Sequence, residues 1–460
     1  MIPWNRVKII GTIGPATSNY KIIKKLIMSG LDIVRINFSH GEFSEYKKTI
    51  SIVRKIEKEI DRPIGILADI PGPKLRIKNF KQELEVKTGD LITINKNNIS
   101  YPIIIKYLIK HSTIFISDGK IKLKVIKSNP DSALCKVHSG GTIKNGAGLN
   151  FPDIDLPIPS VTSQDFKYIE FAMKADIDFI GLSFIKDSKD LTKVRNFLKN
   201  IGKKSFLIAK IERRAAIKNL NEIIKSADGL MVARGDLGVE MPIEKITILQ
   251  KEIIKKCNNS GKPVITATQM LESMIYSPSP TRAEVSDIAN AILDGTDAIM
   301  LSGETAVGKY PVKSVEMMAK VAKNVERNYP FNKVVPIKDN LLDIISSSVS
   351  NISVSCKAKT IVIPTLSGNT ARMVSRYRPD SMIIALTVDK KVQRQLTISW
   401  GVFPYLTSKY KKTESILKKV DMFIKSSSLF EKGDKIIIAA GTLDKKGNLS
   451  NIIKITRIIK

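Results

Sequence analysis

Residues 205–234, SFLIAKIERRAAIKNLNEIIKSADGLMVAR, contain two short apolar runs, SFLIAKI and DGLMVAR, on either side of a helix-like stretch. Six further runs of this kind divide the chain: VKIIGTIG (7–14), DIVRINF (32–38), IGILADI (64–70), DFIGLSF (178–184), KPVITAT (262–268) and DAIMLSG (297–303). Their β-branched composition is typical of buried parallel strands, and the amphipathic spacers predict crossover helices. Eight such units predict an α/β protein built on a closed (β/α)8 barrel of the TIM type.

Polar residues stand at or just beyond the ends of these runs. They are Asn37, Ser39, Asp69, Lys210, Glu212, Asp236, Thr268, Ser302 and Glu304. The active site of a (β/α)8 barrel lies at the C-terminal ends of its strands. We therefore expect these side chains to converge on one rim and to form a site.

The strand and helix rhythm is interrupted once, after the third run. Residues 71–157 hold short alternating segments bounded by Gly, Asn and Asp, which predict a small β-barrel-like domain inserted into the barrel. An insertion in a βα loop emerges on the active-site face, so we expect it to act as a lid. The catalytic barrel is expected to comprise residues 1–70 and 158–328, and a linker leads to a C-terminal α/β domain at 340–460.

Composition limits the class of protein. The chain has 43% hydrophobic and 26% charged residues, no apolar run near the roughly 20 residues of a membrane span, and no signal-peptide pattern at its start. We expect a cytoplasmic protein with no membrane contact and reduced, structural cysteines. The net charge of +31 comes from lysines scattered over helix faces, so we expect a composition bias rather than a nucleic-acid partner.

Two residues of the fifth run carry opposite charges. Lys210 and Glu212 are two positions apart on a strand, which places their side chains on the same side. Glu212 and Asp236, from neighbouring strands, could share one Mg²⁺, with Gly235 and Gly238 allowing close approach of a ligand. A structural salt bridge at Lys210 and an ordinary turn at Arg-Gly-Asp are the alternatives.

Hydroxyl groups follow the last two runs. Thr268 and Ser302 could relay a proton through water, whereas local capping of the following helices is the alternative. No base is adjacent to Ser302, so a nucleophilic serine is not expected. Arg35 interrupts an apolar run, where its planar guanidinium suits phosphate binding better than a surface role does.

Taken together, the motifs resemble those of the pyruvate kinase family. RINFSHG, GPKLRI, SFIK, AKIER, ARGDLGVE, ATQMLESM and LSGETA follow that family's order over nearly the whole chain. The resemblance implies a three-domain subunit, usually in a homotetramer. It also implies transfer of phosphate from phosphoenolpyruvate to ADP, which gives pyruvate and ATP in glycolysis.

The same resemblance assigns roles to residues of the rim. It makes Glu212 and Asp236 ligands of Mg²⁺, with Mn²⁺ as a substitute, and Lys210 the cation that stabilises charge on the phosphoryl group and the enolate. Gly235, Asp236 and Thr268 would hold the substrate. Such positioning and charge neutralisation is what phosphoryl transfer requires of a protein.

Further residues are assigned by the family pattern on the nucleotide side. Arg35 and Arg76 would bind the phosphoryl group and the nucleotide, and Asn37 and His40 would lie near the nucleotide. Ser302 would take part in water-mediated proton delivery to the enolate carbon.

The chain departs from the family at the monovalent-cation site. Many members bind K⁺ through residues that match Asn37, Ser39 and Asp69 and a threonine, with a glutamate nearby; here the last two are Ile70 and Lys74. A lysine ammonium would replace the charge of K⁺ and repel a second cation. The chain thus resembles the K⁺-independent branch, and K⁺ is not expected to be required.

A loop of the C-terminal domain resembles the family's site for phosphorylated effectors. It contains Thr365, Ser367, Gly368, Asn369 and Thr370 ahead of a predicted helix. Ordinary N-capping of that helix is the alternative.

Two other functions compete with this interpretation. Another Mg²⁺-dependent, enolate-forming barrel enzyme, such as an aldolase or lyase, would also need two acids but not Arg35, Arg76 and a nucleotide lid. A nucleic-acid binder would depend on net charge alone.

Overall fold

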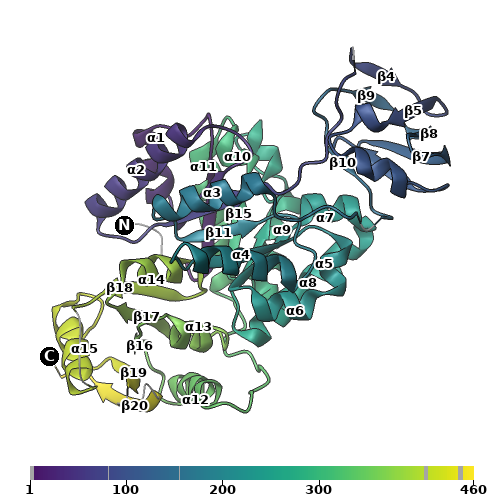
Figure 1. Ribbon diagram of the computed structural model, residues 1–460. Helices are drawn as coiled ribbons and strands as arrows, with labels where there is room; N and C mark the ends of the chain where they lie inside the picture. The colour runs from purple at the N-terminus through teal and green to yellow at the C-terminus, as the bar shows by residue number, and fades with distance from the viewer. Residues whose placement is uncertain (1–4, 81, 155, 409–412, 444–448, 460) are drawn as a thin grey trace.

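The structure is a computed structural model that describes residues 5–80, 82–154, 156–408, 413–443 and 449–459 of the 460-residue chain. Figure 1 shows three parts, with the lid and the C-terminal sheet at opposite ends of a central barrel.

The central barrel consists of eight parallel strands, as the sequence predicts. Its strands are β1 (Lys8–Ile13), β2 (Ile33–Asn37), β3 (Gly65–Ile70), β11 (Phe179–Leu182), β12 (Phe206–Ile211), β13 (Gly229–Ala233), β14 (Val264–Ala267) and β15 (Ala298–Leu301). The closed order is β1-β15-β14-β13-β12-β11-β3-β2. The eight apolar runs of the sequence are these eight strands, so the predicted (β/α)8 fold is confirmed.

Helices surround the barrel and bury their apolar faces against its outer surface. They are α1 (Tyr20–Met28), α2 (Phe43–Ile60), α3 (Ser163–Lys174), α4 (Ser188–Asn200), α6 (Leu220–Ser226), α8 (Ile243–Ser260), α9 (Arg282–Asp294) and α11 (Pro311–Glu326). Three short helices, α5 (Arg214–Lys218), α7 (Arg234–Glu240) and α10 (Gly303–Ala306), begin close behind β12, β13 and β15. These short helices, together with the strand ends, form the rim that carries the site.

The interior of the barrel is filled by side chains and closed at its base by the C-terminal domain. Phe179 and Phe206 pack edge to face with their ring centroids 5.4 Å apart. Ile398, from the 3₁₀ helix η4 (Leu396–Ile398), belongs to the same buried cluster as these rings. The neighbouring Thr397 lies so close to Gly65 that a Cβ there would stand 2.7 Å from its Oγ1. The C-terminal domain therefore completes the hydrophobic core of the barrel.

The inserted segment forms two antiparallel sheets around its own apolar core. The larger sheet has the order β10-β6-β7-β8-β5, and β4 pairs with β9. The strands are β4 (Leu84–Val86), β5 (Leu91–Asn95), β6 (Thr113–Ile116), β7 (Ile121–Ser128), β8 (Ser132–Ser139), β9 (Gly141–Ile143) and β10 (Leu149–Asn150), with 3₁₀ helices η1 (Lys96–Asn98) and η2 (Pro102–Tyr107). Gly72, with φ of +66°, connects β3 to this lid in a conformation that favours glycine.

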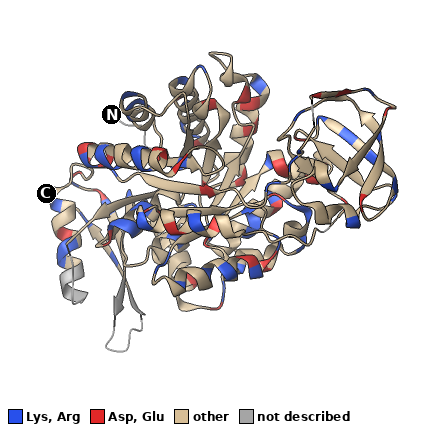
Figure 2. Cartoon of the chain, turned by 45° about the horizontal axis from the view of Figure 1, so that its top comes forward, with Lys and Arg blue, Asp and Glu red and all other residues tan. Residues whose placement is uncertain are grey.

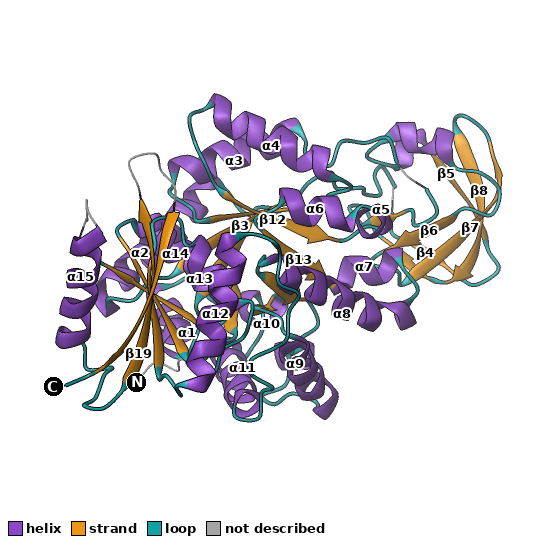
Figure 3. Cartoon of the chain, turned by 90° about the horizontal axis from the view of Figure 1, so that it is seen from below, coloured by secondary structure: helices purple, strands orange, loops and turns teal. Residues whose placement is uncertain are grey.

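The C-terminal domain is a five-stranded sheet covered on both faces. The order is β18-β17-β16-β19-β20, and only the β19–β20 pair is antiparallel. Its elements are α12 (Leu341–Ser355), β16 (Thr360–Pro364), α13 (Asn369–Ser375), β17 (Met382–Thr387), α14 (Lys390–Gln395), β18 (Val402–Leu406), α15 (Thr413–Ser426), β19 (Lys435–Leu443) and β20 (Leu449–Arg457). Helix α15 lies on one side of the sheet, and α12 and α13 lie on the other (Figure 3).

Lysine and arginine are distributed over the helices of the barrel, the lid and the C-terminal domain (Figure 2). In the described part of the chain, every helix is too short or too polar to span a bilayer.

A buried ion pair ties strands β3 and β11 to helix α2. Asp178 is fully buried, and its Oδ2 accepts hydrogen bonds from the backbone N–H of Ile66 at 2.8 Å and from Arg54 Nη2 at 2.7 Å. Burial raises the pKa of Asp178 to about 6, although Arg54 partly offsets this effect.

Removing this carboxylate takes the partner charge of Asp178 away from Arg54 and leaves the buried N–H of Ile66 without an acceptor. We expect Asp178→Ala to lower the free energy of unfolding by roughly 3 kcal/mol, as for other broken buried pairs. Urea unfolding followed by circular dichroism measures it. The matched control is Glu170→Ala, which removes an exposed pair with Lys174 and is expected to change stability by less than about 0.5 kcal/mol. Equal losses in the two variants contradict the prediction.

Candidate active site

Lys210 is at the centre of a buried charge cluster at the barrel rim. Its Nζ lies 2.9 Å from Asp69 Oδ1 and 2.8 Å from Glu212 Oε1, and it donates to Ser183 Oγ at 2.8 Å. The strand geometry thus brings Lys210 and Glu212 to one side, as predicted. Asp69, at the end of β3, lies far from both residues in the sequence but contacts Lys210 in the structure.

Arg35 extends the cluster toward the first strand. Its Nε donates to Asp69 Oδ2 at 2.8 Å, and its Nη1 donates to Thr12 Oγ1 at 2.8 Å. Arg35 is therefore not a surface arginine. One carboxylate, Asp69, accepts from Arg35 on one oxygen and from Lys210 on the other.

These contacts keep the cluster charged. Burial alone would raise the pKa of Asp69, but Lys210 and Arg35 outweigh burial and lower it. Burial alone would lower the pKa of Lys210, but Asp69 and Glu212 raise it above its ordinary value. Lys210 is consequently a permanent cation at any physiological pH.

Two carboxylates lie close together beside this cation. Asp236 is in the first turn of α7, directly after β13, and Glu212 follows β12. Burial and then the negative charge of Glu212 raise the pKa of Asp236 to about 7. Glu212 Oε2 also accepts from the backbone N–H of Phe184 at 2.7 Å. The two carboxylates therefore repel each other, and a cation between them would relieve this repulsion.

The hydroxyl groups of the last two strands are positioned differently from simple helix caps. Thr268 Oγ1 accepts from the N–H of Gly235 at 2.8 Å, which ties the end of β14 to the start of α7. Ser302 precedes α10 without a side-chain cap. Glu304 accepts from the N–H groups of Leu271 at 3.0 Å and Ser302 at 2.7 Å, so this acid fixes the backbone of both strand ends.

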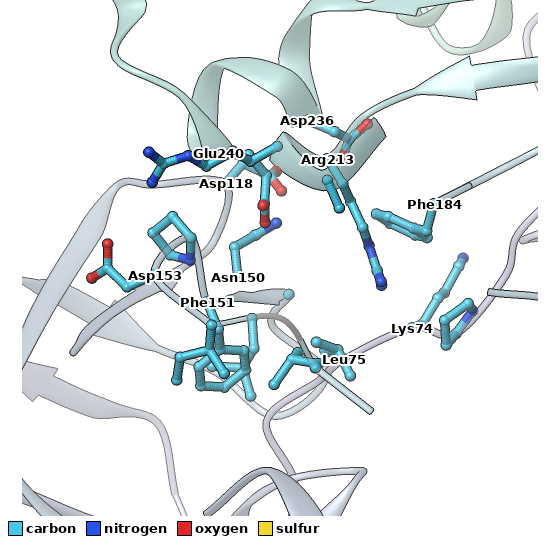
Figure 4. Close-up of a pocket in the computed structure, with 18 of the residues that line it drawn as sticks. Lys74, Leu75, Asp118, Asn150, Phe151, Asp153, Phe184, Arg213, Asp236 and Glu240 are labelled. Carbon is cyan, nitrogen blue, oxygen red and sulfur yellow. The ribbon is translucent and has the colours of Figure 1, made fainter. Parts of the chain in front are cut away.

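A cleft of about 650 Å³ opens between this rim and the lid. Lys74, Arg76 and His40 are among its lining residues, and Figure 4 shows Lys74 directed into it. Burial and then Arg76 lower the pKa of Lys74 to about 8. Burial, followed by the charges of Lys74 and Arg76, lowers the pKa of His40. Asp118 of the lid also faces the cleft, and its charge acts on Asp236.

Other predicted residues lie at the edge of the site or away from it. Asn37 ends β2, and its Oδ1 accepts from the N–H of Ser39 at 3.1 Å. Thr365, Ser367 and Gly368 lie between β16 and α13 in the C-terminal domain, and Asn369 and Thr370 begin α13; all five are apart from the cleft.

Several residues of the site were not identified from the sequence. Thr12 and Ser183 interrupt apolar runs, and that interruption is the signal that would have found them. Phe184 and Arg213 line the cleft beside the cluster. Arg213 is the first of two adjacent arginines in KIERR, and the local sequence does not distinguish it from Arg214.

The comparisons with known proteins agree with this geometry. The family model described as "Pyruvate kinase, barrel domain" matches residues 4–315, and "Pyruvate kinase, alpha/beta domain" matches residues 343–456. The chain belongs to the pyruvate kinase family.

Relatives of similar length lead to the same conclusion. A pyruvate kinase of Thermococcus litoralis is 40% identical over 99% of both chains, and one of Clostridium perfringens is 40% identical over 98% of this chain and 100% of its own. The crystal structure of a pyruvate kinase from Cryptosporidium parvum superposes with a TM-score of 0.92 at 36% identity, covering 98% of this chain and 96% of that one. The predicted fold and the phosphotransferase class are confirmed, and the family match excludes the aldolase or lyase alternative.

Proposed function

We propose that this pyruvate kinase family member transfers the phosphoryl group of phosphoenolpyruvate to ADP in glycolysis, and that the enolate formed is then protonated to pyruvate. The observation that supports this reaction is the cluster of Lys210 and Arg35 on Asp69, beside the carboxylates of Glu212 and Asp236. Two buried cations face the place where negative charge develops, and two acids offer a metal site.

Glu212 and Asp236 fit Mg²⁺, with Mn²⁺ as a substitute. The fit rests on their chemistry: both are hard oxygen donors, and the charge of Glu212 adds to burial in raising the pKa of Asp236. Few protein ligands suit this ion, because it keeps positions for substrate oxygens and water. When bound, the ion supplies positive charge to the phosphoryl oxygens.

The protein's own groups then have separate tasks. Lys210 remains protonated and stabilises negative charge on the phosphoryl group and on the enolate oxygen, while Arg35 binds the phosphoryl group. Gly235, Asp236 and Thr268 hold the substrate, and the Thr268 hydroxyl is fixed at 2.8 Å from the Gly235 N–H. A proton reaches the enolate carbon through water held by Thr268 and Ser302.

The nucleotide is proposed to occupy the cleft beneath the lid. Arg76 binds its phosphates, and Asn37 and His40 lie at the adjoining end of β2. His40 is neutral at pH 7, because burial and the charges of Lys74 and Arg76 lower its pKa. It therefore offers a hydrogen bond rather than a charge.

Proposals on assembly and regulation extend from the family. Thr365, Ser367, Gly368, Asn369 and Thr370 are proposed to bind a phosphorylated effector; Gly368, with φ of +78°, donates its N–H to Thr365 Oγ1 at 2.9 Å. The partners are phosphoenolpyruvate, pyruvate, ADP and ATP, and the location is the cytoplasm. Neither a nucleic acid nor a membrane is proposed as a partner.

The central test is a coupled assay of pyruvate release from phosphoenolpyruvate with ADP and Mg²⁺. We expect activity that EDTA abolishes and that Mg²⁺ or Mn²⁺ restores. Lys210→Met is expected to lower kcat at least about 100-fold, because a preorganised charge is lost. Lys256→Met, which removes a partly exposed lysine of α8 that is not one of the rim residues, is the control and is expected to match wild type. Full activity of Lys210→Met rejects the mechanism.

Lys74 is proposed to replace the charge of K⁺, which makes the enzyme K⁺-independent. Asp69, Asn37 and Ser39 are the remaining part of the monovalent-cation site, and both oxygens of Asp69 are already in contact with cations. The Lys74 ammonium feels the charge of Asp69, which raises its pKa against the effects of burial and Arg76. A second cation would be repelled by this ammonium.

This proposal predicts a dependence on pH. The pKa of Lys74 is lowered to about 8, so its charge is present at pH 7 and is lost as the pH rises to 9. We expect KCl to have no effect at pH 7 beyond that of choline chloride, and to stimulate the enzyme at pH 9. The variant Lys74→Glu is expected to require K⁺ at both pH values. A large K⁺-specific stimulation of wild type at pH 7 rejects the proposal.

A homotetramer is proposed as the assembly. Large apolar side chains are exposed on the barrel: Ile243 (80%) and Ile248 (66%) of α8, and Tyr276 (76%) and Val307 (60%) beside η3 (Glu272–Ile275) and α10. Such exposure is typical of subunit interfaces. Light scattering coupled to size exclusion is expected to give four times 51.1 kDa. A monomer at micromolar concentration contradicts this assembly, and Ile243→Asp is expected to dissociate it.

A further inference from the structure

Phe184 has a backbone conformation that residues other than glycine rarely adopt. Its φ is +55°, in the left-handed region, although it is not a glycine. In this conformation its N–H donates to Glu212 Oε2 at 2.7 Å. The surrounding structure must impose such a conformation, and residues of this kind concentrate at functional sites. The aromatic ring is thereby held in the lining of the cleft, beside the proposed metal ligand Glu212.

Arg213 stacks on this ring. Its Cζ lies 5.1 Å from the centroid of Phe184, a distance at which a guanidinium and an aromatic face attract one another. Arg213 follows Glu212 in the chain and directly precedes α5. Figure 4 shows its side chain crossing the cleft from the level of Asp236 toward the side of Lys74. Its charge also acts on Glu240, so the guanidinium is restrained from more than one direction.

The position of Arg213 distinguishes it from the inner cations. Arg35 and Lys210 are bound to Asp69 and Glu212 at the end of the barrel, where the small substrate is proposed to lie. Arg213 lines the cleft between the rim and the lid, together with Lys74 and Arg76, whereas Arg35 and Lys210 are not among its lining residues. A cleft of about 650 Å³ is far larger than a three-carbon acid requires, and it suits the longer polyphosphate substrate.

We propose that Arg213, held on the ring of Phe184, is a substrate-binding residue that binds the phosphates of the nucleoside diphosphate. The planar fork of arginine binds two phosphate oxygens at once, and stacking fixes its orientation before the nucleotide arrives. The inference rests on the proposed function and adds a residue for the second substrate. Binding of phosphoenolpyruvate does not depend on it.

The test compares Michaelis constants for the two substrates. Arg213→Met keeps an unbranched apolar side chain, although a shorter one, and removes the charged fork. It is expected to raise the KM for ADP about tenfold, whereas kcat and the KM for phosphoenolpyruvate stay within about twofold. Arg213→Lys is expected to lie between Arg213→Met and wild type, because an ammonium keeps the charge but not the bidentate geometry. Calorimetric titration of ADP without phosphoenolpyruvate measures the same loss of affinity independently of turnover.

Lys218→Met is the matched control. Lys218 is an exposed cation of α5 that lines the same cleft without an aromatic partner among the contacts of the described residues. It is expected to leave both KM values within about twofold. The inference is overturned if Arg213→Met binds ADP as wild type does, if both KM values rise equally, or if Lys218→Met has the same effect. If wild type forms no pyruvate, the proposed function fails, and ADP calorimetry on the Arg213 variants still decides the role of Arg213.

Discussion

The buried carboxylate of Asp69 is the constraint on which the rest of the site depends. It is one acid between two cations, and each of the three groups would be expensive to bury alone. Because Asp69 neutralises Arg35 on one oxygen and Lys210 on the other, both cations can remain charged at the end of an apolar barrel. Their positions are then set by three different strands. The charge state of the site therefore depends on the barrel, which brings the ends of these three strands together.

Pairing of opposite charges and of hydrogen-bonding groups explains why so many polar groups can lie at the rim, next to the apolar interior of the barrel. Buried donors and acceptors are matched in pairs: Glu304 satisfies the N–H groups at the ends of β14 and β15, Thr268 satisfies that of Gly235, and Thr12 accepts from Arg35. The bonds of Leu271 to Glu304, of Gly235 to Thr268 and of Arg35 to Thr12 each connect segments of two neighbouring strands. The carboxylates of Glu212 and Asp236 are the exception, since their mutual repulsion is balanced only in part by Lys210. An unbalanced charge at this one place is what a metal-dependent enzyme requires.

The sequence predicts the barrel well because each strand is a short apolar run that ends at a polar residue. The same rule locates Lys210, Glu212, Asp236 and Thr268, since the C-terminal ends of parallel strands must meet at one rim. Phe184 could not be found in this way, because a left-handed backbone at a phenylalanine depends on tertiary packing rather than on local preference. The role of Arg213 depends on which side the lid covers, and this is not encoded in the local pattern. The lowered pKa of Lys74 likewise results from burial and from the charge of Arg76, and both depend on the folded cleft rather than on the local sequence.

The position of Ile398 at the base of the barrel has an evolutionary consequence. This residue belongs to the C-terminal domain, yet it fills the catalytic module's interior together with Phe179 and Phe206. A nonsense codon just before η4 would therefore remove part of the hydrophobic core of the barrel as well as the rest of the C-terminal domain. A lineage that lost all response to effectors would still have to keep the domain, because selection on folding alone would preserve it.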